Sequence, residues 1–224
     1  MSMVLRLNED RLPAGGAPAY LPAIERVIYV LEGDATVEFA SGCAYQATGS
    51  AWLGGEELAL IPGPDGARVL RWELDTEFAG DRGMLVAAPG AGSEGKHSEE
   101  IGLDSRFGWL MRCDRVSFPK GGIAYTHVHQ GPGIRYCLEG QIEIQSEGRS
   151  DYFGPGEAWF ESGLAPVLAI TSKEMETAFV RCFVLPRSCK GRPSIRYVNA
   201  EDAAKPKTQR YKVLGERFIE VVGA

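Results

Sequence analysis

The sequence matches itself when it is shifted by 107 residues. Residues 26–53 align with residues 133–160 without a gap, and 8 of these 28 positions are identical. A Pro-x-Gly-Gly motif lies upstream of each aligned block. A collinear match of this length predicts two copies of one supersecondary unit. We expect a first copy over 10–78, a linker over 79–106, a second copy over 107–187 and a C-terminal extension over 188–224.

The pattern of apolar residues favours strands over helices. Runs rich in Val, Ile, Tyr, Phe and Trp are short and are interrupted by Gly or Pro, which number 28 and 13. Long stretches with helical periodicity are nearly absent. Regularly spaced short strands with turn residues between them predict an all-β sandwich or barrel. The runs expected to form strands are 27–31, 35–39, 69–74, 109–118, 134–138, 142–145 and 178–185.

Composition excludes several classes of protein. Charged residues make up 24% of the chain and hydrophobic residues 44%, which are ordinary values for a globular protein. The net charge of −6 argues against a nucleic-acid partner, because phosphate contacts need clustered Lys and Arg. No apolar run approaches the roughly 20 residues of a membrane helix, so we expect a soluble protein without a membrane partner. Five cysteines without a Cys-x-x-Cys pair favour a reducing compartment, and we expect a cytoplasmic location.

Two segments of the second copy carry recognisable motifs. Residues 122–140 read GIAYTHVHQGPGIRYCLEG, and residues 152–163 read YFGPGEAWFESG. They resemble the first and second motifs of the cupin superfamily, and the first copy resembles them more weakly. The resemblance implies a double-stranded β-helix, or jelly roll, with two tandem cupin barrels in one chain, which is a bicupin. By analogy with cupins, in which sheets commonly pair, we also expect a homodimer.

The resemblance also implies a divalent metal held by three His and one Glu. Of these four positions, His127 and His129 match. Gly133 stands at the position of the Glu, and Pro166 stands near that of the third His. The metal site is therefore carried over for His127 and His129 alone, and a further ligand must come from elsewhere.

Alternation along strands indicates which side chains share a face with the two His. Histidines at i and i+2 on a strand present both imidazoles to one side, which is a bidentate start for Fe, Zn, Mn or Ni. Tyr125 has the same parity. Arg135 has the parity of the family Glu, and Glu161 shares a face with the repeated Trp159. We therefore expect these side chains to point into the second barrel.

The first copy serves as an internal control. The positions that match His127, His129, Arg135 and Glu161 hold residues without this chemistry, namely Tyr20, Pro22, Ile28 and Gly54. Scaffold residues persist in both copies, whereas the imidazoles, guanidinium and carboxylate occur together only in the second. We expect a structural first barrel and a chemically equipped second one.

These residues lead to one main hypothesis and two alternatives. A metal on His127, His129 and Glu161 would act on a small anionic substrate. Arg135 would bind the charge of the substrate. Tyr125 would either donate a hydrogen bond to the substrate or form part of the barrel wall. Glu161 is alternatively the salt-bridge partner of Arg135. The resemblance implies an enzyme of dioxygenase, isomerase, lyase or hydrolase type. The alternatives are a metal-free binding module and a metal-free epimerase or isomerase with His127 as general base.

Overall fold

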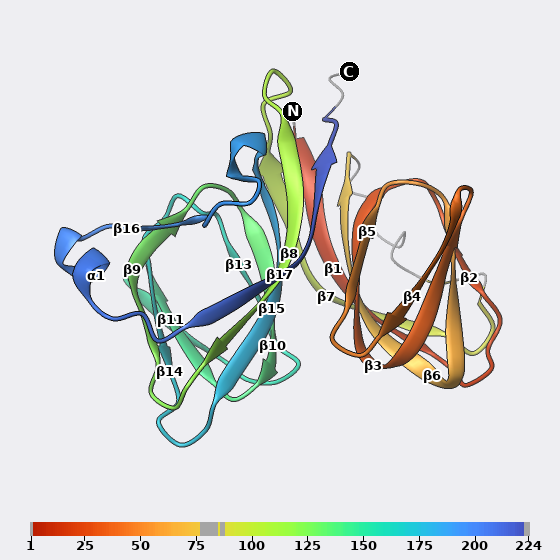
Figure 1. The fold of residues 1–224 in the computed structure, drawn as a ribbon, viewed down its shortest axis with the longest axis horizontal. Coiled ribbons are helices and arrows are strands. Elements are labelled where there is room, and N and C mark those ends of the chain that lie inside the picture. The colour runs from red at the N-terminus through yellow and green to blue at the C-terminus, as the bar shows by residue number, and fades with distance from the viewer. Residues whose placement is uncertain (1, 77–84, 86–87, 222–224) are drawn as a thin grey trace. The chain divides into compact units, whose positions relative to one another are not determined.

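The computed structural model describes residues 2–76, 85 and 88–221, and it consists of two compact units. The first unit extends to Asp104 and the second begins at Ser105. Figure 1 shows that each unit is built almost entirely of strands. This confirms the all-β prediction. None of the helices in the described part of the chain is long and apolar enough to cross a membrane.

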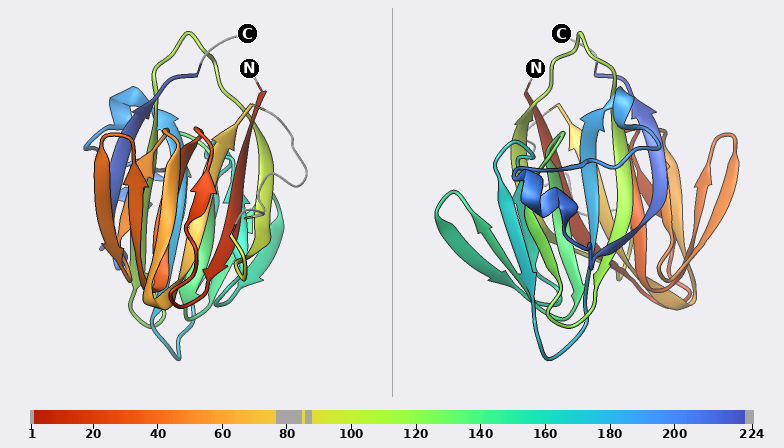
Figure 2. Two further views of the ribbon diagram at one scale, coloured as in Figure 1. Left: turned by 90° about the vertical axis from the view of Figure 1, so that its right-hand side faces the viewer. Right: turned by 60° about the vertical axis from the view of Figure 1, so that its left-hand side comes forward.

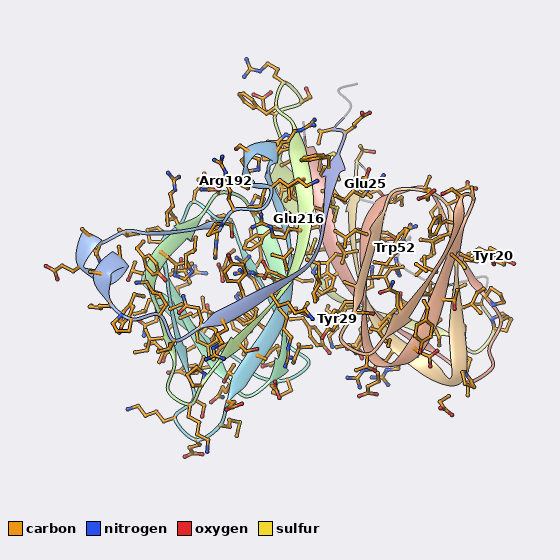
Figure 3. All side chains as sticks on the ribbon, viewed as in Figure 1. Tyr20, Glu25, Tyr29, Trp52, Arg192 and Glu216 are labelled. Carbon is orange, nitrogen blue, oxygen red and sulfur yellow. The ribbon has the colours of Figure 1, made fainter. Side chains whose placement is uncertain are left out.

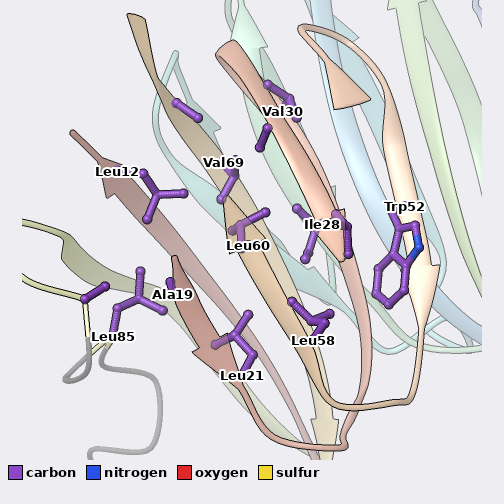
Figure 4. Packing of buried hydrophobic residues seen from close by; sticks show 14 residues of the cluster. Leu12, Ala19, Leu21, Ile28, Val30, Trp52, Leu58, Leu60, Val69 and Leu85 are labelled. Carbon is purple, nitrogen blue, oxygen red and sulfur yellow. The ribbon is translucent and has the colours of Figure 1, made fainter. Parts of the chain in front are cut away.

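The first unit is one seven-stranded antiparallel sheet in the order β4-β3-β6-β1-β7, with β2 paired to β6 and β5 paired to β3. Its buried apolar cluster includes Ile28, Leu60, Val69 and Trp52, which Figure 4 shows from close by. The strands are β1 (Ser2–Leu12), β2 (Ala19–Leu21), β3 (Glu25–Phe39), β4 (Gly42–Ala47), β5 (Ala51–Gly54), β6 (Leu58–Asp75) and β7 (Gly92–Gly102).

The expected boundaries of the first copy differ from the observed unit. Strand β1 begins at Ser2, well before residue 10. The expected linker over 79–106 contains β7, whose residues pair with β1 from Gly92 to Gly102. The polar composition of this segment suggested a linker, but β7 lies at the edge of the sheet, where polar side chains can remain in solvent. Residues 77–84 and 86–87 lie outside the described residues.

The second unit consists of two five-stranded antiparallel sheets. One has the order β13-β10-β15-β8-β17 and the other β12-β11-β14-β9-β16. The strands are β8 (Trp109–Phe118), β9 (Ile123–His129), β10 (Gly133–Glu139), β11 (Ile142–Ser146), β12 (Arg149–Phe153), β13 (Ala158–Glu161), β14 (Val167–Thr171), β15 (Thr177–Pro186), β16 (Ile195–Tyr197) and β17 (Arg210–Ile219). Side chains from both sheets form its apolar cluster.

The glycine that ends each repeated Tyr-x-Leu-Glu-Gly segment is required by the backbone. Gly33 and Gly140 have φ values of +72° and +78°, a region that side chains other than glycine rarely adopt. A Cβ atom on Gly33 would lie 2.1 Å from the carbonyl oxygen of Gly66, and one on Gly140 would lie 2.3 Å from that of Glu176. The two copies therefore place the same residue in the same close approach between strands.

The C-terminal extension belongs to the second unit. Strand β16 pairs with β9, and β17 pairs with β8 along almost its whole length. A 3-10 helix (Arg187–Cys189) precedes β16, and the short helix α1 (Ala200–Ala204) lies between β16 and β17. Figure 2 shows this blue segment lying across the strands of its own unit. The extension expected over residues 188–224 thus contains two strands that pair within the same unit.

Candidate metal and substrate site

A cavity of about 240 Å³ lies between the two sheets of the second unit. Strands of both sheets and the C-terminal extension form its wall. Its lining includes His127, His129 and Glu161, three of the residues predicted from the sequence. The lining residues from the extension are Pro193, Ser194, Ile195, Tyr197, Lys207, Gln209 and Tyr211.

The two histidines are buried side by side on β9. Their ring centroids lie 4.9 Å apart, with the rings nearly perpendicular. The Nδ1 atom of His127 lies 2.7 Å from the carbonyl oxygen of Tyr125, and that of His129 lies 3.4 Å from the carbonyl oxygen of Ser194. Because a carbonyl oxygen only accepts hydrogen bonds, these contacts favour a proton on Nδ1 and leave the Nε2 lone pairs free.

The electrostatic surroundings keep both rings neutral. Burial is the main cause that lowers the pKa of His127, against the opposing charge of Glu161. Burial, followed by the positive charges of Arg181 and Arg135, lowers the pKa of His129 well below its ordinary value. Both imidazoles are therefore unprotonated near neutral pH, as a metal ligand or a proton acceptor must be.

Glu161 brings the carboxylate to this cluster from strand β13 of the other sheet. Its Oε2 lies 3.8 Å from Nε2 of His129 and accepts a hydrogen bond of 2.7 Å from Arg135. Its Oε1 accepts a hydrogen bond of 2.9 Å from the indole of Trp159. Glu161 is thus oriented by two donors while it faces the histidines, and the structure combines both of its predicted surroundings.

Gly133 explains why no carboxylate comes from the expected position. It lies directly opposite Glu161 in the pairing of β10 with β13. A Cβ atom on Gly133 would lie 2.5 Å from the carbonyl oxygen of Cys182 and 2.8 Å from the ring of Phe183. That ring also packs against His129, with 4.8 Å between ring centroids. A side chain at 133 has no room, and the carboxylate comes from its cross-strand partner.

Arg135 has a different position from the one predicted for a substrate-binding residue. Its side chain is fully buried, and it is absent from the cavity lining found in the described residues. Its guanidinium donates to Glu161 and to the carbonyl oxygen of Gly133, and it lies 4.7 Å from the centre of the Phe183 ring. Burial lowers the pKa of Arg135 to about 10, although Glu161 opposes this effect. Arg135 holds Glu161 in place from behind the lining of the cavity.

Tyr125 does not share a face with the histidines, because β9 is irregular. Val167 pairs with His127, but Ala169 pairs with Ala124, so β9 contains one residue more than β14 over this stretch. Such a bulge reverses the alternation beyond it. Ala124 consequently lines the cavity, whereas Tyr125 does not appear in the lining of the described chain and lies beneath the ammonium group of Lys205 at 4.6 Å.

Several polar groups of the cavity escaped the sequence reasoning. Arg181 on β15 lies directly opposite Asp114 on β8 and donates to it at 2.6 Å, and both line the cavity. Lys207 and Tyr197 come from the C-terminal extension, with the ammonium group 3.8 Å from the ring centre. The signal for Asp114 was present, because two charged residues, Arg112 and Asp114, alternate with apolar ones along an otherwise buried strand.

The first unit holds a buried ion network instead. Arg71 lies opposite Ile28, as Arg181 lies opposite Arg135 in the second unit. Its guanidinium contacts Asp10 at 2.6 Å and Glu73 at 2.7 Å, and all three side chains are buried. Tyr20, at the position of His127, is 69% exposed and points away from this unit (Figure 3).

No set of three His, Cys, Asp or Glu side chains within the described ranges is arranged as a complete metal site. The chemistry of the donors nevertheless fits a divalent ion. Two neutral imidazoles with anchored Nδ1 atoms and one carboxylate are the donor types that Fe, Zn, Mn and Ni accept.

Comparison with solved structures addresses the fold. AerE from Microcystis aeruginosa has a TM-score of 0.58 and 11% identity, covering 82% of this chain and 88% of that one. Oxalate decarboxylase from Bacillus subtilis has a TM-score of 0.62 and 12% identity, covering 90% of this chain and 72% of that one. The chain has a cupin jelly-roll fold. No protein-family model matches the sequence, and no curated protein matches it significantly, so this likeness concerns the cupin fold alone.

Proposed function

We propose that the second unit is a metal-dependent cupin enzyme acting on a small organic anion. One observation carries the proposal: His127, His129 and Glu161 lie together at the wall of one cavity, each held from outside the cluster. A site that orients its donors through a second layer of contacts is typical of metal and catalytic centres.

His127, His129 and Glu161 would hold the ion. A bound divalent metal supplies a Lewis acid that polarises a substrate oxygen. Arg135 and Trp159 orient the carboxylate of Glu161 through their hydrogen bonds, and Ser194 orients the ring of His129. Arg181 lies on the cavity wall as the cation nearest to a substrate charge, in the role that the sequence assigned to Arg135.

A second candidate is a binding module that works without metal. It is favoured by the hydrogen bonds of Glu161, since both carboxylate oxygens already accept one from Arg135 or Trp159. In that case the neutral histidines would contact the ligand directly as hydrogen-bonding groups.

We also propose that the two units arose from one duplicated cupin repeat. The pairing registers support this, because Ile28 lies opposite Trp52 just as Arg135 lies opposite Trp159. All five cysteines are free thiols, which supports a reducing compartment such as the cytoplasm.

Elemental analysis of the purified, metal-reconstituted protein tests the function. We expect the wild type to hold a divalent metal and the His127→Ala/His129→Ala variant to lose it. His97→Ala is the matched control, because His97 is the third histidine of the chain and lies on β7 of the other unit. Equal metal content in the wild type and the double variant would remove His127 and His129 from the site. Ligand binding that survives chelation would then favour the binding module.

A further inference from the structure

The cavity has two layers of opposite chemistry. On β8, β9, β13 and β15, polar and apolar residues of the same strand both face the cavity, whereas β11 and β14 contribute apolar residues only. Arg181 and Asp114 lie opposite each other, and two residues along, Phe179 lies opposite Val116. The polar layer comprises Arg112, Asp114, His127, His129, Glu161 and Arg181, and the apolar layer comprises Val116, Phe118, Ala124, Ile142, Ile144, Trp159, Ala169 and Phe179.

The apolar layer has a fixed shape. Trp159 packs edge-on against Phe179 at 5.3 Å and stacks on Phe153 at 4.9 Å, measured between ring centroids. Its members belong to the buried apolar cluster of the second unit. An apolar cavity of about 150 Å³ is large enough to bind benzene. The 240 Å³ available here therefore accommodates one aromatic ring together with a short polar substituent.

The polar layer contains the cations Arg112 and Arg181, and Lys207 of the C-terminal extension also lines the cavity. Arg181 donates from Nε and Nη2 to Asp114, and its Nη1 has no hydrogen-bond partner among the described residues. Arg112 is paired with Glu216 of β17. A carboxylate on the ligand can therefore meet Arg181 and the histidines. A second carboxylate would lie against Ile142, Ile144 or Ala169 and lose its hydration without compensation.

The C-terminal extension covers the polar layer. Tyr197 and Ile195 of β16 pair with His127 and His129 respectively. Lys207 and Tyr211, both exposed, line the cavity from the same segment. Tyr211 lies opposite Val116, so this segment also borders the apolar layer.

From this layering we infer that the ligand is a monocarboxylate with an apolar body about the size of one aromatic ring. Its body lies among Trp159, Phe179 and Ile144, and its carboxylate lies beside Arg181. This inference rests on the proposed function for the location of the site, and it names the class of substrate. The same layering disfavours a short diacid, whose second carboxylate could avoid the apolar layer only beside Lys207.

Calorimetric titration of the full chain tests this class, with and without added metal. The probes are 3-phenylpropionate, its uncharged amide, acetate and succinate. We expect 3-phenylpropionate to bind at least about tenfold more tightly than each of the other three probes. The amide lacks the charge, acetate lacks the apolar body, and succinate lacks the apolar body and carries a second charge.

Two variants locate the body of the ligand. Ala169→Leu fills the apolar layer, and we expect it to weaken 3-phenylpropionate about tenfold or more while acetate changes little. Ala203→Leu on the exposed face of α1 is the control and leaves both affinities unchanged. If Ala169→Leu does not fold, Ile144→Ala enlarges the same layer and is expected to admit 2-naphthylacetate.

The outcomes separate the two proposals. Succinate binding as tightly as 3-phenylpropionate, or a folded Ala169→Leu variant with unchanged affinity for it, overturns the inferred class. Selective binding of 3-phenylpropionate by protein that holds no metal supports the class while it contradicts the metal-dependent function. Metal binding by His127 and His129 without selectivity among the probes supports the metal-dependent function and contradicts the inferred class of ligand.

Discussion

The buried pair of Arg135 and Glu161 makes the sharpest energetic prediction. Arg135 is fully buried, and the side chain of Glu161 is 9% exposed. Burial is the main cause that lowers the pKa of Arg135 from its ordinary value to about 10. That lowering corresponds to roughly 3 kcal/mol of unfavourable free energy for keeping the guanidinium charged in the fold.

Removing one partner should cost more than removing both. Glu161→Gln leaves a buried guanidinium without a carboxylate, which we expect to lower the free energy of unfolding by about 3–5 kcal/mol. Adding Arg135→Met removes the orphaned charge and should return stability to within about 1 kcal/mol of the wild type. Glu139→Gln is the matched control, because Glu139 pairs with Arg115 at 2.8 Å but both side chains are largely exposed. That change should cost less than about 1 kcal/mol.

Urea unfolding of metal-free protein measures these differences. A loss of about 3 kcal/mol moves the midpoint of the transition by about 1–3 M for ordinary slopes. The reasoning is refuted if Glu161→Gln and Glu139→Gln shift the midpoint equally, or if the double variant is as unstable as Glu161→Gln alone.

Two further predictions concern cysteine reactivity and backbone geometry. At pH 8 a thiol reagent should label one cysteine per native chain, Cys43, because the other four are buried. Burial also raises the pKa of Cys137 to about 11. The Cys43→Ser variant should then show no fast labelling in a spectrophotometric thiol assay. Gly33→Ala should lower the free energy of unfolding by roughly 2–5 kcal/mol, because it adds a backbone clash to an unfavourable φ. Gly15 has a similar φ of +59°, but a Cβ atom there would meet nothing within 4 Å. Gly15→Ala should therefore lower the free energy of unfolding by only about 1–2 kcal/mol, as measured by thermal unfolding. Equal losses for the two variants would contradict this account.

The sequence was sufficient to predict the fold class and part of the site. Alternation and turn residues predicted strands, and the motif resemblance together with strand alternation selected His127, His129 and Glu161, which all line one cavity. Tyr125 was misplaced because a bulge adds a residue to β9, and no local pattern marks that bulge. Arg181 was missed because its importance depends on cross-strand pairing with Asp114, 67 residues away.

The C-terminal strands also show why pattern boundaries can mislead. Residues 188–224 lack any counterpart motif in the first copy, which suggested an appendage. The sequence left open whether this extension adds a strand to its own barrel or to a partner's, and the structure shows β16 and β17 as neighbours to both sheets of the second unit. Pairing over long sequence separation is set by the whole fold and is weakly encoded in any short window.

The pairing of β17 with β8 has a practical consequence for anyone who trims this chain to a minimal barrel. A fragment ending at residue 187 would retain both histidines and Glu161 but would lack every wall residue from Pro193 to Tyr211. It would also leave Arg112 without the carboxylate of Glu216 and uncover an edge along β8. If such a fragment were inactive, the cause would be the missing cavity wall and the aggregation-prone edge, because His127, His129 and Glu161 would still be present.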